Sequence, residues 1–176
     1  MITTINKGIH TVDEGVIVHS VNCIGAVGGL AGAIARKWPK NAEQYKEYVR
    51  HRKSSIMLLG SVFEVNVAHN VIVANLFGQY GIGTGKQQTE YAALISGFKR
   101  IADTVFYGDD KIPDYSNHEY YLSRLEYYLS RLTLNDVYIP YKIGCGLGGA
   151  DWNIVEEILH KVFDNSHKNV YICRYE

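Results

Sequence analysis

The sequence is poor in the residues that mark extracellular, metal-bound or membrane proteins. Only three of its 176 residues are cysteines, and Cys23, Cys145 and Cys173 form no Cys-x-x-Cys pair, which argues against a disulfide framework and a zinc site. No apolar run approaches the roughly 20 residues that span a bilayer, and the first residues lack the basic start and apolar centre of a signal peptide. We therefore expect a cytoplasmic protein with no metal ion and no membrane partner.

Net charge and linker-like segments are missing as well. Eighteen basic residues balance eighteen acidic ones, so the overall charge attracts neither nucleic acid nor an anionic membrane, and any anion must be bound locally. Only three prolines occur, and no segment has the composition of a linker or of a low-complexity tract. The length suits a single domain that covers residues 1–176.

Glycine, in contrast, is frequent and clustered. Of 17 glycines, 12 lie in three short stretches, each following an apolar run that is typical of a strand. Glycine allows positive φ and a close approach of the backbone, so its amide N–H groups can converge on an anion. Three such loops at strand ends, each followed by helical sequence, predict a nucleotide or phosphate site in an α/β sheet. The clustered glycines are Gly25, Gly28, Gly29, Gly32, Gly78, Gly81, Gly83, Gly85, Gly144, Gly146, Gly148 and Gly149.

The apolar patterns predict alternating strands and helices, and hence a three-layer α/β/α sandwich with a mixed, largely parallel sheet. A seven-residue segment occurs twice in tandem, at 119–125 and 126–132, and its leucine stripe suits a helix that packs on the sheet or, alternatively, binds a partner. A loop is expected at 107–118. Strands are expected at 2–7, 15–22, 60–67, 71–77, 137–143 and 169–174, and helices at 31–38, 88–105 and 152–163, with a further helix capped by Asn41.

Two common nucleotide motifs are excluded by their spacing. A P-loop ending at Gly85 and Lys86 needs a glycine and a hydroxyl residue where Tyr80 and Gln87 stand. Residues 144–149 have the glycine spacing of a dinucleotide-binding loop, but only 27 residues follow them, and that motif normally opens a longer βαβαβ unit. The glycine loop remains as a backbone cradle for an anion.

Two of the glycine stretches carry a specific resemblance. The run His-Ser-Val-Asn-Cys-Ile-Gly at 19–25, continued by Gly-Gly-Leu-Ala-Gly-Ala-Ile-Ala at 28–35, resembles the ribose-binding loop of the macro domain family. The run Ile-Gly-Cys-Gly-Leu-Gly-Gly-Ala-Asp-Trp at 143–152 resembles its diphosphate-binding loop. The likeness covers essentially the whole chain and is greatest to the branch that contains the ADP-ribose 1''-phosphate phosphatases.

The resemblance implies that the chain binds ADP-ribose without a metal ion or a cofactor. Many macro domains carry an acidic residue near the position of Gly8 that binds the adenine amino group, and this sequence has none there. The residues that the resemblance assigns to the ligand are Gly8, Ile9, Asn22, Cys23, Val27, Gly28, Gly29, Leu30, Ala31, Gly32, Gly144, Cys145, Gly146, Leu147, Gly148 and Gly149.

Four polar residues are candidates for catalysis, and each has a structural alternative. Asn22 can donate to a ribose or phosphate oxygen or bind its own turn. His19 can move a proton near neutral pH, but strand alternation places it on the face opposite Asn22, where it would be a buried, hydrogen-bonded histidine. Asp151 can orient a water molecule or cap the following helix. Lys86 can attack an anomeric carbon or neutralise a phosphate.

These residues give three hypotheses of function. The first is hydrolysis of ADP-ribose 1''-phosphate to ADP-ribose and phosphate. The second is removal of ADP-ribose from a protein carboxylate or a nucleic-acid base, with an ADP-ribosylated macromolecule as substrate and Lys86 or Asp151 at the anomeric carbon. The third is a reader that binds ADP-ribose without turnover. The sequence leaves the oligomeric state open.

Overall fold

The computed structural model describes residues 1–52, 54–107 and 133–174 and is built around a six-stranded sheet. The strand order is β1-β8-β7-β2-β4-β3, and every neighbouring pair is parallel except the β3–β4 hairpin. The prediction of a mixed, largely parallel sheet is therefore confirmed. The strands are β1 (Ile2–Ile5), β2 (Gly15–Asn22), β3 (Val62–Ala68), β4 (Val71–Gln79), β7 (Asp136–Pro140) and β8 (Asn169–Cys173).

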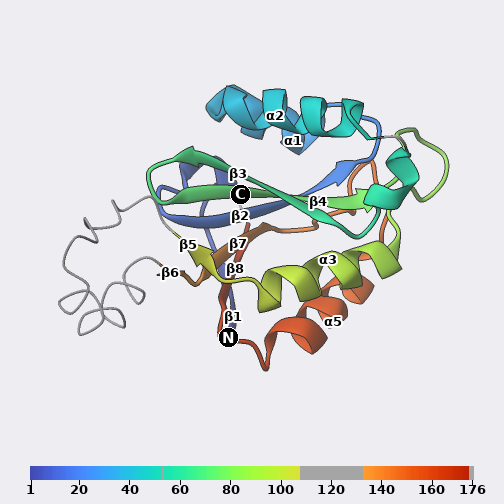
Figure 1. The fold of residues 1–176 in the computed structure, drawn as a ribbon. Coiled ribbons are helices and arrows are strands. Elements are labelled where there is room, and N and C mark those ends of the chain that lie inside the picture. Colours follow the sequence, from blue (N-terminus) through green and yellow to red (C-terminus); the bar gives the residue numbers. More distant parts are fainter. Residues whose placement is uncertain (53, 108–132, 175–176) are drawn as a thin grey trace.

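Helices cover both faces of this sheet, which gives the expected three layers. The helices α1 (Gly29–Lys37) and α2 (Pro39–Arg50) lie on one face, and α3 (Tyr91–Asp103) and α5 (Trp152–Phe163) lie on the other (Figure 1). Two short 3-10 helices, η1 (Ile9–Thr11) and η2 (Ser55–Leu58), and a small antiparallel pair, β5 (Phe106–Tyr107) with β6 (Thr133–Leu134), complete the described chain. The sequence patterns predicted neither the 3-10 helices nor the small pair.

The central strand β2 shows why the sequence folds this way. Val16 and Val18 belong to the core between the sheet and the α3/α5 layer, whereas Ile17 packs in the core that includes Ile34 and Trp38 of the α1 region. Apolar residues at three consecutive positions, Val16 to Val18, suit a parallel strand that is buried on both faces.

The junction between α1 and α2 corrects one expectation. Asn41 does not cap a helix, because α2 begins at Pro39, with Trp38 in the capping position. Proline is favoured at the first helical position, where a missing N–H costs nothing. Asn41 instead lies inside α2, is 3% exposed, and exchanges two hydrogen bonds (3.1 and 2.8 Å) with the side-chain amide of Asn75 on β4.

Most predicted bounds lie within two residues of those in the structure, and the larger differences have local causes. The strand at 15–22 and the helix at 152–163 have the predicted bounds, whereas the strand expected at 137–143 ends at Pro140 in a turn. The helix expected from residue 88 begins at Tyr91, because the backbone N–H groups of Gln88 and Thr89 both bind the carbonyl of Gly148. The tandem repeat at 119–132 and most of the loop expected at 107–118 lie outside the described residues.

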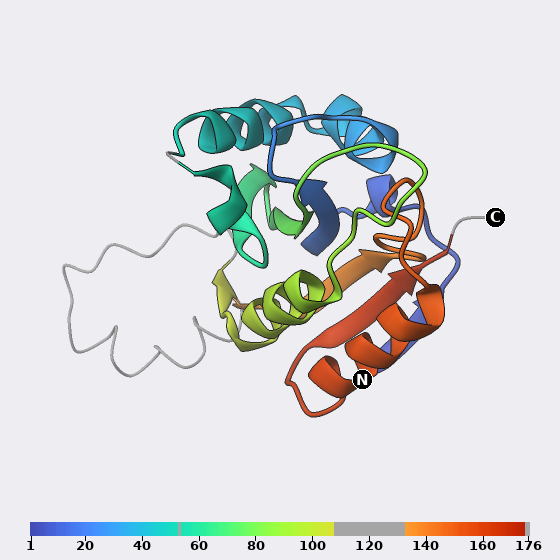
Figure 2. The same ribbon diagram turned by 90° about the vertical axis from the view of Figure 1, so that its right-hand side faces the viewer.

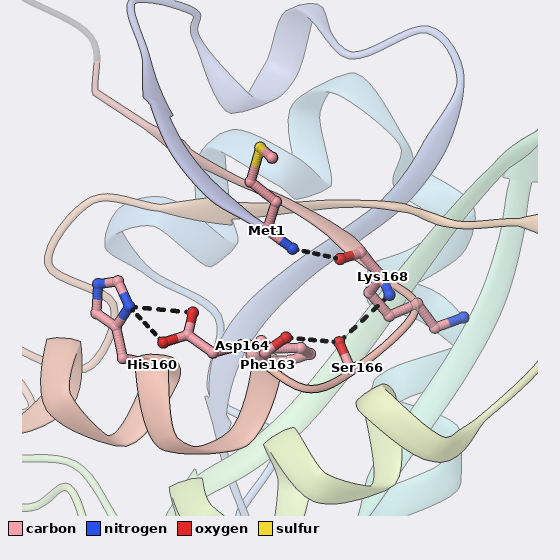
Figure 3. Close-up of polar contacts among 6 residues, drawn as sticks. All are labelled: Met1, His160, Phe163, Asp164, Ser166 and Lys168. Atoms are coloured by element: carbon pink, nitrogen blue, oxygen red, sulfur yellow. Dashed lines mark hydrogen bonds and ion pairs between the residues drawn. The ribbon is translucent and has the colours of Figure 1, made fainter.

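The edge of the sheet next to α5 is tied together by polar contacts (Figure 3). The amino group of Met1 donates to the carbonyl of Lys168 (3.2 Å), next to the pairing of β1 with β8. The Ser166 hydroxyl donates to the carbonyl of Phe163 (2.9 Å) and accepts from the Lys168 N–H (3.3 Å), which fixes the connection from α5 to β8. None of the described helices has the length and apolarity that a membrane span requires.

Candidate functional site

The main cavity lies at the carboxyl ends of the strands and has a volume of about 820 Å³. It crosses the sheet from Gln79 at the end of β4, past Asn22 at the end of β2 and Pro140 at the end of β7, to Cys173 on β8. Figure 2 shows the loops that follow β2, β4 and β7 gathered at this end of the sheet. This is the position at which open α/β sheets bind their ligands, and the volume is in the range of small-molecule sites. We call this cavity the cleft.

Asn22 holds the loop that follows β2 in shape. Its Oδ1 atom accepts from the N–H groups of Ile24 (3.1 Å) and Ala26 (3.0 Å), and its amide donates to the carbonyl of Ala26 (2.8 Å). The hydroxyl of Tyr45 on α2 donates to the carbonyl of Asn22 (2.6 Å) and lies 3.0 Å from its Oδ1 atom. Asn22 therefore lines the cleft as a residue already bonded within the protein.

The loop after β2 also places the first turn of α1 beside the cleft. Gly28 is the N-cap residue, without a side-chain cap, and Gly29, Leu30 and Ala31 form the first turn. Within the described part of the chain no acceptor binds the N–H groups of these three residues, whereas the N–H of Gly32 already donates to the carbonyl of Gly28 (3.1 Å). Unpaired amides and the positive end of the helix dipole favour an anion at this place.

The loop after β7 forms the opposite wall of the cleft. Turn hydrogen bonds fold residues 142–150, from the N–H of Cys145 to the carbonyl of Lys142 (2.9 Å) and from the N–H of Ala150 to the carbonyl of Gly144 (3.1 Å). The Thr89 hydroxyl donates to the same Gly144 carbonyl (2.8 Å). The N–H groups of Gln88 and Thr89 both donate to the carbonyl of Gly148 (2.9 Å each), so the segment that follows the second glycine stretch is bonded to the third stretch.

Neither packing nor backbone conformation requires a glycine at position 28 or 146. A Cβ atom added to Gly28 or to Gly146 would meet nothing within 4 Å, and neither residue has a positive φ. Gly148 is the opposite case, since an added Cβ would overlap the Thr89 hydroxyl and the carbonyl of Gly144. Packing therefore explains Gly148, whereas the missing side chains of Gly28 and Gly146 only keep the cleft open beside backbone amides.

The two ends of the cleft carry different polar groups. At the end next to β4, which we call the β4 end, the polar side chains are those of Ser20, Asn22 and Gln79, all uncharged. At the end next to β8, which we call the β8 end, they are those of His10, Tyr141, Lys142, Cys173 and Arg174.

No carboxylate lines the cleft among the described residues, and the same part of the chain has no cluster of side chains that would hold a metal ion. The two lining cysteines are weak nucleophiles, because burial raises the pKa of the Cys145 thiol and raises that of Cys173 to about 11. The cleft is suited to an anionic ligand that is held by amides and cations.

His19 lies outside the cleft, on the face of the sheet that α2 covers, where Asn75 links it to Asn41 of α2. It is 2% exposed, and its Nε2 atom lies 2.8 Å from Oδ1 of Asn75. Because Asn75 donates through its own amide to Asn41 and to the carbonyl of Phe63 (3.0 Å), its Oδ1 accepts and Nε2 of His19 donates. Burial lowers the pKa of His19 to about 4, and the hydrogen bond that His19 donates to Asn75 opposes this only in part.

Asp151 and Lys86 do not line the cleft either. The Asp151 carboxylate accepts from the N–H of Asn153 (2.9 Å) as the N-cap of α5, and its backbone N–H donates to the Tyr91 hydroxyl (2.9 Å). Lys86 is exposed in the loop after β4, of which Ile82 and Gly83 do line the cleft. Of the four catalytic candidates, the structure brings only Asn22 to the cleft.

Among the residues assigned to the ligand by resemblance, all except Cys23, Gly32 and Gly149 line the cleft. Cys23 is buried, Gly32 is half-buried within α1, and Gly149 is exposed outside the cleft. Sequence analysis missed Ser20 and Gln79, which the strand ends already suggested because they neighbour Asn22 on β2 and β4. Three further lining residues lie in the quoted runs and glycine stretches without having been assigned to the ligand, namely Val21, Gly83 and Ile143. The remaining lining residues had not been assigned to the ligand either, namely His10, Ala26, Ile82, Pro140, Tyr141, Lys142, Cys173 and Arg174.

Comparisons with known proteins identify the fold. No protein-family model matches the sequence, and no curated protein does. Among solved structures, a protein of unknown function from Bacteroides thetaiotaomicron is 25% identical, with a TM-score of 0.72 over 98% of this chain and 97% of that one.

Of two further similar structures, one is a macrodomain and the other contains bound ADP-ribose. A macrodomain protein from Streptomyces coelicolor is 25% identical, with a TM-score of 0.68 over the full length of both chains. DarTG from Thermosipho africanus, solved in complex with ADP-ribose, is 15% identical with a TM-score of 0.65, and the match covers 97% of this chain and 41% of that one.

Proposed function

We propose that this chain, which has the fold of the macrodomains, binds ADP-ribose in the cleft and hydrolyses ADP-ribose 1''-phosphate to ADP-ribose and inorganic phosphate. The observation that carries the proposal is the open space at Gly28 and Gly146, two glycines that neither backbone conformation nor packing requires. Glycine at such positions lets a ligand approach the main chain closely. The ADP-ribose bound to a structural neighbour supports this choice of ligand.

The diphosphate of the ligand would lie between the two glycine loops. On one side are the free N–H groups of Gly29, Leu30 and Ala31 at the start of α1, and on the other is the turn around Gly146. A helix N-terminus with unpaired amides is a common phosphate site. The terminal ribose would then lie at the β4 end beside Asn22, and the adenosine at the β8 end beside Gly8, as the resemblance of these segments implies.

The phosphatase proposal follows from the neutral character of the β4 end. Water adds to the phosphorus, the bond from phosphorus to the anomeric oxygen breaks, and the products are ADP-ribose and phosphate. In the transition state negative charge shifts onto the anomeric oxygen that leaves, which suits amide donors and the absence of a carboxylate among the described lining residues. Preorganised donors of this kind contribute on the order of 3 kcal/mol each to a transition state.

Specific observations support the two competing functions. The positions of His19, Asp151 and Lys86 outside the cleft favour a reader that binds ADP-ribose without turnover. The exposed Lys86 follows Ile82 and Gly83 in a loop that lines the cleft, which favours an ADP-ribosyl hydrolase with this lysine at the anomeric carbon.

Calorimetry with ADP-ribose and a phosphate-release assay with ADP-ribose 1''-phosphate test the proposal together. The expected result is binding, with phosphate release by the wild type and by Lys86→Ala. Binding without release from any substrate would leave only the reader. Cleavage of an ADP-ribosylated protein or nucleic acid that is lost in Lys86→Ala would establish the hydrolase, and no binding at millimolar ADP-ribose would overturn all three functions.

A further inference from the structure

One lysine in the cleft wall has a backbone conformation that is unfavourable for its residue type. Lys142 has a φ of 59°, in the left-handed region. Among the described residues other than glycine, only Asn70, with a φ of 54°, also has a positive φ. Asparagine tolerates this region, because its short polar side chain can bond nearby backbone groups, whereas lysine adopts it at a cost in stability.

The turn that follows β7 imposes this conformation. The N–H of Ile143 donates to the carbonyl of Pro140 (3.1 Å), which closes a four-residue turn with Lys142 at its third position. A turn with a positive φ at this position favours glycine or asparagine. The N–H of Cys145 then donates to the carbonyl of Lys142 (2.9 Å), so the turn continues directly into the third glycine stretch. A residue that contradicts the local preference in this way indicates a function for its side chain.

The positive charge of Lys142 lies at the cleft wall. Lys142 is exposed and lines the cleft, together with Tyr141 and Cys145. Its Nζ atom lies 5.4 Å from the centroid of the Tyr141 ring. Its charge also acts on the Cys145 thiol, where it opposes the rise in pKa that burial causes. Interactions with two lining residues, one before and one after it in the sequence, place the ammonium beside the cleft.

No acidic group of the described chain competes for this charge. Lys142 forms no ion pair there, and no described carboxylate lines the cleft. The two acidic residues that flank it in the sequence are engaged elsewhere. Asp136 accepts from the side-chain amide of Asn169 (2.8 Å), and Asp151 caps α5. The ammonium is therefore available to an anion that enters the cleft.

We propose that the Lys142 ammonium binds the diphosphate of ADP-ribose and that this contact is the reason for a lysine in the left-handed turn. This inference rests on the proposed binding of ADP-ribose in the cleft. The free amides at the start of α1 and the turn around Gly146 can bind a diphosphate by themselves, and the ammonium adds a point charge and a charge-assisted hydrogen bond. Strained backbone is retained at ligand sites when the surrounding structure fixes it, and here the turn hydrogen bonds do so.

Calorimetry with ADP-ribose and thermal unfolding of the same variants test both parts of this proposal. Lys142→Gln keeps the unfavourable turn and removes the charge, so it should bind ADP-ribose about tenfold more weakly at an unchanged melting temperature. Lys142→Asn should bind as weakly as Lys142→Gln but melt at a higher temperature than the wild type, because asparagine tolerates a positive φ. Wild-type affinity in Lys142→Gln would overturn the contact. A melting temperature of Lys142→Asn no higher than that of the wild type would overturn the explanation of the turn.

Smaller ligands locate the contact on the diphosphate. The loss of affinity in Lys142→Gln should be similar for ADP and ADP-ribose and absent for adenosine, with ADP and adenosine measured as competitors of ADP-ribose. An equal loss for adenosine would place Lys142 at the base or its ribose and overturn the assignment. Salt should weaken ADP-ribose binding by the wild type more than binding by Lys142→Gln, because it screens an exposed charge.

Two changes outside the cleft are matched controls. Lys99→Gln removes one positive charge from the exposed surface of α3 and should leave the affinity at the wild-type value. Asn70→Lys places a lysine at the other left-handed position, in the turn between β3 and β4, and should lower the melting temperature without changing the affinity. A loss of affinity in either control as large as that in Lys142→Gln would overturn the specific role of Lys142.

The wild-type measurement separates this inference from the function on which it rests. If the wild type binds ADP-ribose and Lys142→Gln binds it equally well, the role of Lys142 is overturned and ADP-ribose binding stays intact. If the wild type does not bind ADP-ribose at millimolar concentration, the proposed function itself fails.

Discussion

The two ends of the cleft differ in how their polar groups are held. At the β4 end, Asn22 and Gln79 bind backbone atoms of their own loops, with the Gln79 amide donating to the carbonyl of Gly81 (2.8 Å). At the β8 end, the side chains of Lys142 and Arg174 lie beside the Tyr141 ring, and both residues line the cleft. One end consists of neutral groups fixed by the fold, and the other of cations.

This difference is possible because the middle of the cleft depends on the main chain. Backbone amides are present whatever the side chains are, so the proposed diphosphate site would place no demand on charge at either end. Side chains at the ends would then be free to set selectivity, one for the terminal ribose and the other for the adenosine.

The largest loss of ADP-ribose affinity is expected when the middle of the cleft is blocked, because the ligand then reaches neither end. Gly146→Val would place methyl groups in space that is now empty and keep the ligand from the amides. Overpacking typically costs about 1–3 kcal/mol, which corresponds to a loss of affinity on the order of 10- to 100-fold. Calorimetry with ADP-ribose measures the loss of affinity. The melting temperature should stay near that of the wild type, because no protein atom lies within 4 Å of a Cβ atom added at Gly146.

Two other glycines provide matched controls for this change. Gly32→Ala lies in α1 and outside the cleft, and its Cβ would meet only the Arg36 side chain at 3.8 Å, so affinity and stability should be preserved. Gly148→Ala should lower stability, because its Cβ overlaps Thr89 and the Gly144 carbonyl. If Gly146→Val bound ADP-ribose like the wild type, the ligand would not lie in this loop.

The second prediction concerns how the β4 end is held. Asn22→Ala removes the side chain that binds the loop at Ile24 and Ala26 and leaves their backbone groups without partners. We expect a loss of about 2 kcal/mol in the free energy of unfolding and weaker ADP-ribose binding, measured by urea unfolding and calorimetry. Tyr45→Phe removes only one donor and should show a smaller loss. Full stability with lost binding would instead identify Asn22 as a direct ligand contact.

The sequence predicted the fold well wherever one local signal dominates. The apolar run at 15–22 and the amphipathic pattern at 152–163 each have a single interpretation, and both bounds agree with the structure. Asn41 was misassigned because its role depends on Asn75, 34 residues away, and a contact of that kind leaves no local trace. The start of α3 was misplaced for the same reason, since the carbonyl of Gly148 binds the preceding residues.

The candidate site was predictable for its loops but not for its β8 end. Gly28 and Gly146 lie in glycine stretches that follow strand-like apolar runs, a local pattern that predicts an anion site. Arg174 and His10, in contrast, reach the same cleft only when β8, β1 and η1 are assembled. A histidine on a strand has the same appearance in sequence whether it faces a ligand or the core, and only the neighbouring strand explains the position of His19.

The third prediction tests whether His19 is structural. Its pKa of about 4 in the folded protein lies below the ordinary value of 6.5, so the unfolded chain takes up the proton first as pH falls. Folding stability should therefore be unaffected by this group above about pH 6.5 and decrease between about pH 6.5 and about pH 4, by about 2 kcal/mol at about pH 5. Urea unfolding at several pH values measures this slope.

The matched variant for this slope is His19→Gln, which cannot titrate. It should be less stable at neutral pH, because the bond to Asn75 is altered, and its stability should change less between about pH 6.5 and about pH 5 than that of the wild type. The other histidines remain in both proteins, so the difference belongs to His19. If stability changed with pH equally in the wild type and in His19→Gln, His19 would have the same pKa in the folded and unfolded chains. That result would contradict the lowering of its pKa by burial.

The smallest effect is expected just outside the cleft, at Asp151. As the N-cap of α5 its carboxylate binds the N–H of Asn153, and Asp151→Ala should cost about 1 kcal/mol of stability. Asp151→Asn keeps an oxygen at the same position and should be nearly as stable as the wild type, since asparagine caps helices about as well as aspartate. The two variants should release phosphate from ADP-ribose 1''-phosphate at the wild-type rate once each is folded. A large loss of rate in Asp151→Asn with unchanged stability would mean that the carboxylate reaches the β4 end during the reaction, and the neutral character of that end would then hold only for the protein without its ligand.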